Sequence, residues 1–405
     1  MFTNIKSALD FIEHQINGDI TFEQFQSIYN ELAITHKPYT IHVTGTNGKG
    51  STSKLLSDIL SVNDLKVGLF TSPHMDVSND RLRVNNQNIS DEDLLMLIND
   101  FYPLIIKHNL NFFQIYTLIA LRYFQMMSCD IVIIEVGIGG LLDSTNVIDG
   151  DLCIITNVAM DHVEKLGGSL EAITKQKAGI IKEGSTVVTH VNDEALLEIL
   201  NEVTNDKKAE LHVLYDVESE IVNNKQVFTD NKERYTLNSR ATYQVKNAQL
   251  VLKSCECLER DGFSITKDSI TNSLAQFKWS GRFEVLSEDP YVLVDGAHNL
   301  AGIEALIEST DPSSVVIFSA MQDKDYKHMI EVLQAYYHEV VFAEFGYYRG
   351  LTFDQIQSMK TFKSSDEAYT YLIKTHPDHS IIVCGSLYFV SHFRDFWRDM
   401  NGSNN

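Results

Sequence analysis

A glycine-rich segment near the N-terminus has the residue types that bind phosphate. It reads HVTGTNGKGST over residues 42–52, and it follows an apolar run and opens an amphipathic stretch. Its three glycines would let backbone N–H groups approach phosphate oxygens, and the start of a helix adds its positive dipole end. Lys49 would reach the terminal phosphates, with Ser51 or Thr52 near a metal ion. The spacing is shorter than G-x-x-x-x-G-K-[ST], so we interpret it as a variant phosphate loop. A glycine-rich turn without a ligand is the alternative.

Three further polar side chains each come directly after an apolar run. Ser72 follows KVGLFT, Glu135 ends DIVIIE, and His162 follows DLCIITN after a short loop. In parallel sheets the carboxyl ends of the strands meet at one edge, where ligands bind. A hydroxyl, a carboxylate and an imidazole at that edge could share one hard cation with nucleotide phosphates. Taken singly, Glu135 is a strand-end surface carboxylate and His162 a loop histidine; their common position favours the metal site.

Lys177 lies in a helix-like segment close behind the His162 loop. Its ammonium could pair with a carboxylate on a solvated face. A buried lysine can instead lose its proton and react with carbon dioxide, which gives an anionic carbamate that could bind a metal. The spacing alone leaves both interpretations open.

Two motifs in the last third of the chain also sit where strands are expected to end. DGAHN (295–299) ends one apolar run and starts a helix, and Gly385 and Ser386 end the last run. An N-cap turn explains the Asp and Asn of DGAHN. It does not explain His298, which makes this segment a candidate ligand site.

The elements that must position these residues alternate between strand and helix. Strand-like apolar runs and helix-period segments follow one another, which predicts βαβ units and a mostly parallel sheet. The expected strands of the first part are at 39–44, 66–71, 130–137, 151–158 and 185–191, and the expected helices are at 49–60, 91–108, 112–124 and 169–182. The more polar segment 205–237 predicts a small antiparallel patch at the edge, and helices are expected at about 243–261 and 266–277.

A second α/β alternation begins after Arg282. Its expected strands are at 291–296, 314–320, 338–345 and 380–386. The length of 405 residues also exceeds one ordinary core, since domains usually hold ~100–200 residues. We therefore predict a phosphate-loop domain with a mostly parallel sheet over 1–280 and a smaller Rossmann-like α/β domain over 281–405.

Composition and charge exclude several classes of protein. With 44% apolar and 22% charged residues, the chain is not disordered, collagen-like or coiled-coil. A net charge of −22 argues against binding nucleic acid or an anionic membrane surface. No apolar run approaches the ~20 residues of a spanning helix, and we expect a cytoplasmic monomer. Five cysteines without a CxxC pair favour reduced thiols.

Taken in order along the chain, the motifs resemble those of the folylpolyglutamate synthases of the Mur ligase superfamily, which include bifunctional dihydrofolate synthases. The matching segments are HVTGTNGKGS (42–51), TSPH (71–74), EVGIGGLLDSTNV (135–147), DH (161–162), KAGIIK (177–182), WSGR (279–282), DGAHN (295–299), DKDY (323–326) and GSLY (385–388). The resemblance implies a Mur ligase-type first domain and a glutamate ligase domain after it.

The resemblance also implies roles for individual residues, with ATP and magnesium as cofactors. ATP would be bound by Asn47, Gly48, Lys49, Gly50, Ser51, Asn247, Arg282 and Asp295, and magnesium by Ser72, Glu135 and His162. Lys177 matches a lysine that is carbamylated in relatives. Catalytic roles are implied for Lys49, Lys177, His298 and Ser386, of which His298 and Ser386 would lie near the incoming glutamate. Contacts with the folate are implied for Arg81, Leu142, Asp143 and Ser144.

The implied function is an ATP-dependent ligase that adds L-glutamate to the γ-carboxylate of a reduced folate through an acyl phosphate. Three departures from the family pattern stand out: WSGR replaces WPGR, Phe113-Gln114 replaces Phe-Glu, and the N-terminal segment lacks the Gly-x-x-Arg stretch by which bifunctional members recognise dihydropteroate. The last departure favours polyglutamylation alone. The alternatives are a bifunctional enzyme, a binding module that hydrolyses ATP without ligation, and a small-molecule kinase.

Overall fold

The computed structural model describes residues 1–15, 18, 20–32 and 34–402. The chain forms two compact units. The first holds residues 1–159, 163–217 and 246–275, and the second holds 160–162, 218–245 and 276–402. The predicted division at 280/281 stays a prediction, and each unit is described by itself below.

The first unit is built on an eight-stranded sheet in the order β4-β3-β2-β5-β1-β6-β7-β8. The strands are β1 (Tyr39–Thr44), β2 (Val67–Phe70), β3 (Leu82–Val84), β4 (Gln87–Asn88), β5 (Ile131–Glu135), β6 (Leu152–Ile155), β7 (Thr186–Thr189) and β8 (Glu210–Val213). In the described sheet, the neighbouring strands β2, β5, β1, β6, β7 and β8 pair in parallel, whereas β3 pairs antiparallel with both β2 and β4. The central strands are buried along their length, which explains their unbroken apolar sequences.

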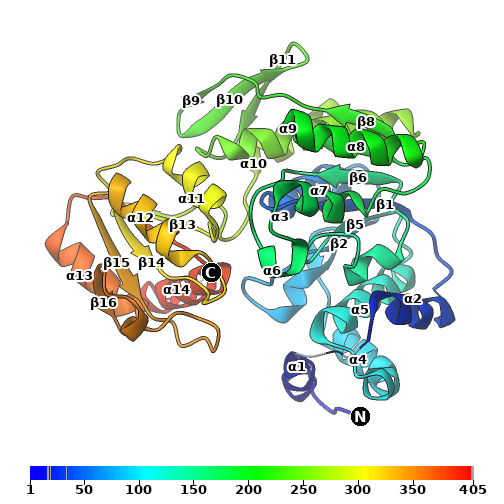
Figure 1. The fold of residues 1–405 in the computed structure, drawn as a ribbon, viewed down its shortest axis with the longest axis horizontal. Helices are drawn as coiled ribbons and strands as arrows, with labels where there is room; N and C mark the ends of the chain where they lie inside the picture. Colours follow the sequence, from blue (N-terminus) through cyan, green and yellow to red (C-terminus); the bar gives the residue numbers. More distant parts are fainter. Residues whose placement is uncertain (16–17, 19, 33, 403–405) are drawn as a thin grey trace. The chain divides into compact units, whose positions relative to one another are not determined.

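Helices of the first unit are α1 (Ile5–Glu13), α2 (Phe22–Glu31), α3 (Lys49–Ser61), α4 (Asp91–His108), α5 (Phe112–Met126), α6 (Val163–Leu166), α7 (Leu170–Ala178), α8 (Glu194–Asp206), α9 (Tyr243–Arg260) and α10 (Lys267–Gln276), of which α9 begins and α10 ends in the second unit. Short 3-10 turns are η1 (Ser78–Arg81) and η2 (Ser144–Val147). Figure 1 shows α1, α2, α4 and α5 grouped together, and they share one apolar core with β2 and β5.

Gln114 closes the N-terminus of α5 together with Asn111. Its side-chain oxygen accepts the Asn111 N–H at 2.9 Å, and the Asn111 side chain accepts the Gln114 N–H at 3.0 Å. This reciprocal pair satisfies two backbone donors that a helix start leaves open. The amide therefore serves as a cap without a charge.

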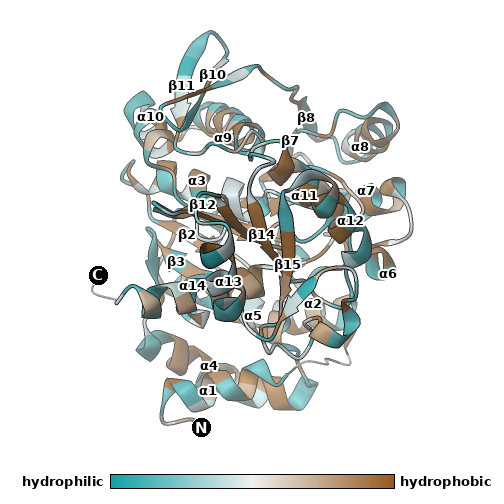
Figure 2. Cartoon of the chain, turned by 90° about the vertical axis from the view of Figure 1, so that its left-hand side faces the viewer, coloured by the Kyte–Doolittle hydropathy of each residue, from teal (hydrophilic) through white to brown (hydrophobic). Residues whose placement is uncertain are grey.

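The second unit contains a six-stranded sheet in the order β12-β13-β17-β14-β15-β16. Its strands are β12 (Glu284–Glu288), β13 (Tyr291–Asp295), β14 (Val315–Phe318), β15 (Glu339–Ala343), β16 (Lys360–Phe362) and β17 (Ile381–Cys384), parallel except for the β12/β13 pair. The remaining elements are α11 (Leu300–Ile307), α12 (Tyr326–Tyr336), η3 (Phe353–Gln355), α13 (Ser365–Thr375) and α14 (Leu387–Met400). Figure 2 shows the hydrophobic colouring on β14 and β15, whose residues 315–318 and 340–343 are buried.

The segment 205–237 departs from its prediction. The structure divides it between β8, which extends the large parallel sheet, and a separate antiparallel sheet of β9 (Ser219–Val222), β10 (Lys225–Asp230) and β11 (Glu233–Leu237). Asn223-Asn224 and Asn231-Lys232 have positive φ, which suits the two tight turns between these strands. The antiparallel patch is therefore a sheet of its own and not an edge of the large one.

Two further observations bear on the sequence predictions. All five cysteines are buried free thiols, as expected from their spacing. Among the helices that the structure describes, none is both long and apolar enough to cross a membrane.

Candidate active site

The glycine-rich loop lies between β1 and α3, as predicted. Gly45 and Gly48 have φ of +152° and +86°, a region that favours glycine. Side chains would also collide there: a Cβ at Gly45 would lie 1.7 Å from Thr156 Oγ1, and a Cβ at Gly48 would lie 2.4 Å from Asn247 Oδ1. Both the backbone and the space therefore require glycine.

The first turn of α3 presents donors that a phosphate group could use. Gly48 is the N-cap and supplies no side-chain cap, so the backbone N–H groups of the first turn depend on partners outside the helix. Lys49 Nζ lies over the loop and donates to the carbonyls of Gly45 at 2.9 Å and Thr46 at 3.1 Å. In the next positions Ser51 and Thr52 are buried, and Thr52 Oγ1 has no hydrogen-bond partner in the described part of the chain.

The segment after β6 holds the loop from its other side. Asn157 Oδ1 accepts the Asn47 N–H at 2.9 Å, and Thr156 Oγ1 donates to the Asn47 carbonyl at 2.5 Å. The Thr46 N–H donates to the Asn157 carbonyl, and the Thr46 hydroxyl donates to the Ala159 carbonyl. Sequence inspection did not identify Thr156 or Asn157. The only signal was their position at the end of a buried strand.

Ser72 and Glu135, two of the predicted metal ligands, lie together. Glu135 ends β5, pairs in register with Val43 of β1 and is 2% exposed. Its Oε2 accepts the Ser72 N–H at 2.9 Å. The carboxylate therefore stands beside the strand that leads into the phosphate loop.

His162, the third predicted ligand, is grouped with the second unit. Its Nε2 lies 3.4 Å from Lys324 Nζ. No cluster of three or more His, Cys, Asp or Glu side chains suited to a metal occurs in the residues described. Mg²⁺ is usually held by one or two carboxylates together with water and substrate phosphates, so Glu135 and Ser72 beside a phosphate loop fit a nucleotide-bound magnesium ion.

Lys177 is buried in α7 with 2% exposure. The structure therefore excludes a lysine on a solvated face, which was one of the two interpretations of this residue. Burial makes a charged ammonium costly and favours either a close partner or a neutral, reactive amine.

The predicted folate-side residues differ in their surroundings. Leu142 is 62% exposed, whereas Asp143 and Ser144 are buried. Arg81 is also buried; its Nε donates to His74 Nδ1 at 3.1 Å, and its guanidinium lies over the rings of Phe112 and Tyr116 at 4.9 and 5.3 Å from their centroids. Burial and then the positive charge of Arg81 lower the pKa of His74 to about 3, which keeps its ring neutral.

In the second unit, Asp295 ends β13 and is a buried acceptor. Its carboxylate accepts the Tyr243 hydroxyl at 2.6 Å and the N–H groups of Phe283 and Ala297 at 2.7 and 2.8 Å. Burial raises its pKa, although these bonds oppose the shift. Arg282 Nη1 lies 3.5 Å from the Gly296 carbonyl, and Ser386 is buried at the N-cap of α14.

Asp161 organises a cluster that the sequence predictions missed. Lys324 Nζ lies 2.5 Å from its Oδ1, and Asn299 Nδ2 donates to its Oδ2 at 2.9 Å. His298 Nε2 lies 3.5 Å from Oδ2, while His298 Nδ1 contacts the Gly296 carbonyl at 2.8 Å. Burial alone would raise the pKa of Asp161, but the hydrogen bond and charge of His298 and the charge of Lys324 hold it well below its usual range. Lys324 belongs to the DKDY motif (323–326), and this motif was the sequence feature from which the cluster could have been predicted.

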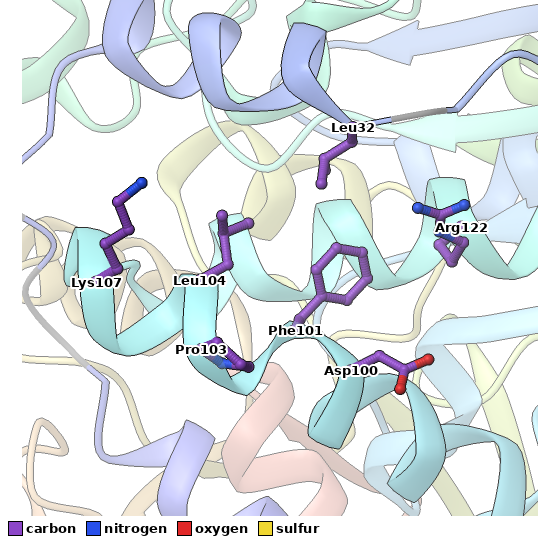
Figure 3. Close-up of a pocket in the computed structure, with 7 residues that line it drawn as sticks. All are labelled: Leu32, Asp100, Phe101, Pro103, Leu104, Lys107 and Arg122. Atoms are coloured by element: carbon purple, nitrogen blue, oxygen red, sulfur yellow. The ribbon is translucent and has the colours of Figure 1, made fainter.

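A surface cavity of about 480 Å³ lies elsewhere in the first unit. Figure 3 shows side chains from α4, α5 and the end of α2 around it; they belong to Leu32, Asp100, Phe101, Pro103, Leu104, Lys107 and Arg122. None of the predicted site residues lines it.

Comparison with known proteins assigns the chain to a family. Residues 43–254 match the Mur ligase middle domain, and residues 281–387 match the Mur ligase, glutamate ligase domain. A Bacillus subtilis protein named dihydrofolate synthase/folylpolyglutamate synthase is 33% identical, with 87% of this chain and 89% of the relative covered.

Two solved structures share the fold over almost the whole chain. A folylpolyglutamate synthase solved with AMPPCP and folate has a TM-score of 0.85 and 27% identity, and 97% of this chain and 99% of that one are covered. Escherichia coli FolC in complex with DHPP and ADP has a TM-score of 0.88 and 26% identity, with 99% of each chain covered. The chain therefore belongs to the Mur ligase family, and within it to the ATP-dependent ligases named folylpolyglutamate synthase and dihydrofolate synthase.

Proposed function

We propose that this chain lengthens the glutamate tail of a reduced folate by forming an amide between its γ-carboxylate and the amine of L-glutamate, with ATP and magnesium. The observation that carries the proposal is the glycine-capped start of α3 with Lys49 over the loop, next in the sheet to the buried pair of Glu135 and Ser72. Family membership supplies the acceptor class.

The phosphate loop would contribute position and charge. A carboxylate is unreactive toward an amine at neutral pH, so it must first be activated, here as an acyl phosphate. Backbone donors of residues 47–51 would hold the nucleotide phosphates, and Lys49 would leave its carbonyl partners to neutralise charge on the transferred group. A magnesium ion bound by Glu135, Ser72 and His162 would supply further positive charge at the phosphates. Asn247 borders Gly48 and suits a nucleotide contact; the contacts of Arg282 and Asp295 with ATP stay predictions.

Lys177 would act as a carbamate. Its burial supports this proposal, because a neutral lysine amine can react with carbon dioxide and the resulting anion can bind a metal. Crystals grown with bicarbonate should show density beyond Nζ, and an unmodified ammonium in well-defined density would refute the proposal.

His298 and Ser386 are proposed to lie near the incoming glutamate. His298 Nδ1 contacts the Gly296 carbonyl at 2.8 Å and its Nε2 lies 3.5 Å from Asp161 Oδ2, so both ring nitrogens face acceptors and the ring is suited to orienting the incoming amine. Arg81, Leu142, Asp143 and Ser144 are proposed on the folate side, and Arg81 is suited to an anion because it is a buried cation.

ADP release tests this function against an ATP-hydrolysing binding module. Release should require both tetrahydrofolate and L-glutamate, because the acyl phosphate forms on one and is consumed by the other. Release that is indifferent to both substrates would refute the ligase and support the module. Lys49→Ala, which removes the loop ammonium, is the negative control.

A second candidate is the bifunctional enzyme, because the Bacillus subtilis relative carries both names. It would also join dihydropteroate to L-glutamate. We expect little turnover with dihydropteroate as the sole acceptor. Turnover comparable to that with tetrahydrofolate would replace the monofunctional proposal with the bifunctional one.

A further inference from the structure

A buried line of hydrogen bonds connects β1 with the loop of residues 137–147, which we call the substrate loop. His42 Nε2 lies 2.9 Å from Thr145 Oγ1, and Thr145 Oγ1 donates to Asp143 Oδ1 at 2.6 Å. His42 and Thr145 have no exposed surface, and Asp143 is 8% exposed. Polar groups this deep are costly unless they are paired, so their pairing is a fixed feature of the fold.

The direction of each hydrogen bond follows from the donors available. The single hydroxyl proton of Thr145 goes to the carboxylate of Asp143, so Thr145 Oγ1 must accept a proton from His42 Nε2. His42 is then the neutral tautomer with its proton on Nε2. Burial and then the positive charge of Lys182 lower the pKa of His42 to about 3, so the ring stays neutral at physiological pH. Only a hydroxyl at position 145 can accept from His42 and donate to Asp143 at the same time.

Asp143 in turn closes the substrate loop on itself. Its Oδ2 accepts the Ile138 N–H at 3.0 Å, and its Oδ1 accepts the Thr145 N–H at 3.0 Å in addition to the hydroxyl. The carboxylate therefore joins the first part of the loop to the start of η2. The carboxylate oxygens of Asp143 accept hydrogen bonds from the loop itself, which indicates that Asp143 holds the loop in place.

Other anchors hold the same loop. Thr44, on the same face of β1 as His42, donates to the Gly139 carbonyl at 2.5 Å. Asn146 Nδ2 donates to the carbonyls of Leu141 and Gly179, at 3.0 and 3.1 Å. The strand that leads into the phosphate loop thus also supports the substrate loop.

We propose that Thr145 is a positioning residue that transmits the fixed geometry of β1, through His42 and Asp143, to the loop segment carrying Leu142 and Ser144. The role of that segment in binding the acceptor rests on the proposed function. Without the hydroxyl, the loop samples more conformations and only a fraction of molecules is ready to bind the acceptor. Apparent affinity for the acceptor falls by that fraction, while the phosphate loop keeps its own contacts with β6.

The test is Thr145→Val, which keeps the volume of the side chain and removes the hydroxyl, compared with Thr145→Ser, which keeps the hydroxyl. We expect Thr145→Val to raise KM for tetrahydrofolate about tenfold, equal to about 1.4 kcal/mol, with KM for ATP within about twofold of wild type. Thr145→Ser should restore the acceptor KM to within about threefold of wild type. Thr145→Ala provides a second hydroxyl-free variant if the valine does not fold.

The pattern of constants separates positioning from general weakening of the fold. A smaller fraction of folded protein lowers the apparent kcat, whichever substrate is varied, and leaves the KM for ATP and the KM for tetrahydrofolate unchanged. An unchanged acceptor KM in the hydroxyl-free variant, an equal rise in both KM values, or a serine variant as impaired as the valine would overturn the proposal. A wild-type protein that fails to ligate would instead refute the proposed function, so the two failures are distinguishable.

Discussion

Glu135 is a carboxylate with almost no exposure, held at the end of a buried strand. Such a group is costly to bury as a charge unless protein donors or a cation stabilise it. The Ser72 N–H is one donor, at 2.9 Å. The proximity of both residues to the strand that leads into the phosphate loop supports the proposal that this carboxylate holds magnesium at the nucleotide phosphates.

Glu135→Gln tests that purpose with little change in shape. The amide oxygen can still accept the Ser72 N–H, but the negative charge is gone, so we expect magnesium-dependent turnover to fall at least about 100-fold. Turnover measured across a magnesium titration checks this. Glu183→Gln is the matched control, because its ion pair with Lys208 is exposed and worth little. Wild-type activity in the Glu135 variant would remove this residue from the metal site.

At the scale of elements, β1 serves two loops at once. Its end opens into the phosphate loop, and two side chains on one of its faces, His42 and Thr44, support the substrate loop. The phosphate loop depends on glycine for a second reason besides its backbone: Asn247 of α9 fills the space where a Cβ at Gly48 would stand. Strand, loop and helix therefore shape the proposed nucleotide site together.

Gly48→Ala should damage nucleotide binding selectively. The new Cβ would meet Asn247 Oδ1 at 2.4 Å, and φ at this residue is +86°, so the loop must shift. We expect Kd for an ATP analogue to rise about tenfold or more, because backbone donors would no longer point at the phosphates. Isothermal titration with an ATP analogue is the measurement.

Gly184→Ala is the control for backbone strain alone. Gly184 also has positive φ, +69°, but a Cβ there meets nothing within 4 Å. It should lose some stability and keep its affinity for nucleotide. Equal nucleotide affinity in the two glycine variants would show that the space beside Asn247 does not matter.

Elements with a strong period could be predicted from the sequence. The strands predicted at 39–44, 130–137 and 314–320 are found at 39–44, 131–135 and 315–318, and the predicted helix at 91–108 has those bounds in the structure. The two-residue strand β4 carries no apolar pattern, and it forms only because β3 pairs with it. The predicted helix at 169–182 ends at Ala178, where Gly179 packs against Leu141 so closely that a Cβ would overlap it. Such endings depend on tertiary contacts, which no local pattern contains.

The candidate site was predictable to the same degree. Motifs gave the phosphate loop and the strand-end positions of Ser72 and Glu135, which the structure places together. They did not give the partners that hold these motifs, such as Asn157 on the phosphate loop and Thr145 under the substrate loop. These partners are ordinary polar residues, and only the fold shows that they are buried and paired.

At the scale of the whole molecule, the net charge of −22 opposes the approach of anionic ligands. The proposed ligands ATP, folate and glutamate are anions and therefore need a local group of positive charges to hold them. We propose that the start of α3 with Lys49 does so in the first unit, where Arg81 is a further buried cation over the neighbouring rings of Phe112 and Tyr116. In the second unit, Lys324 and His298 gather around Asp161. The acidic remainder of the surface favours solubility.

The most direct test of the account is the product of the reaction. Purified protein is incubated with ATP, magnesium, tetrahydrofolate and L-glutamate, and the acceptor is analysed by mass spectrometry while ADP is measured in the same sample. The account predicts an acceptor heavier by glutamyl residues, with one ADP formed for each amide bond. ADP formation without any glutamylated acceptor would contradict it.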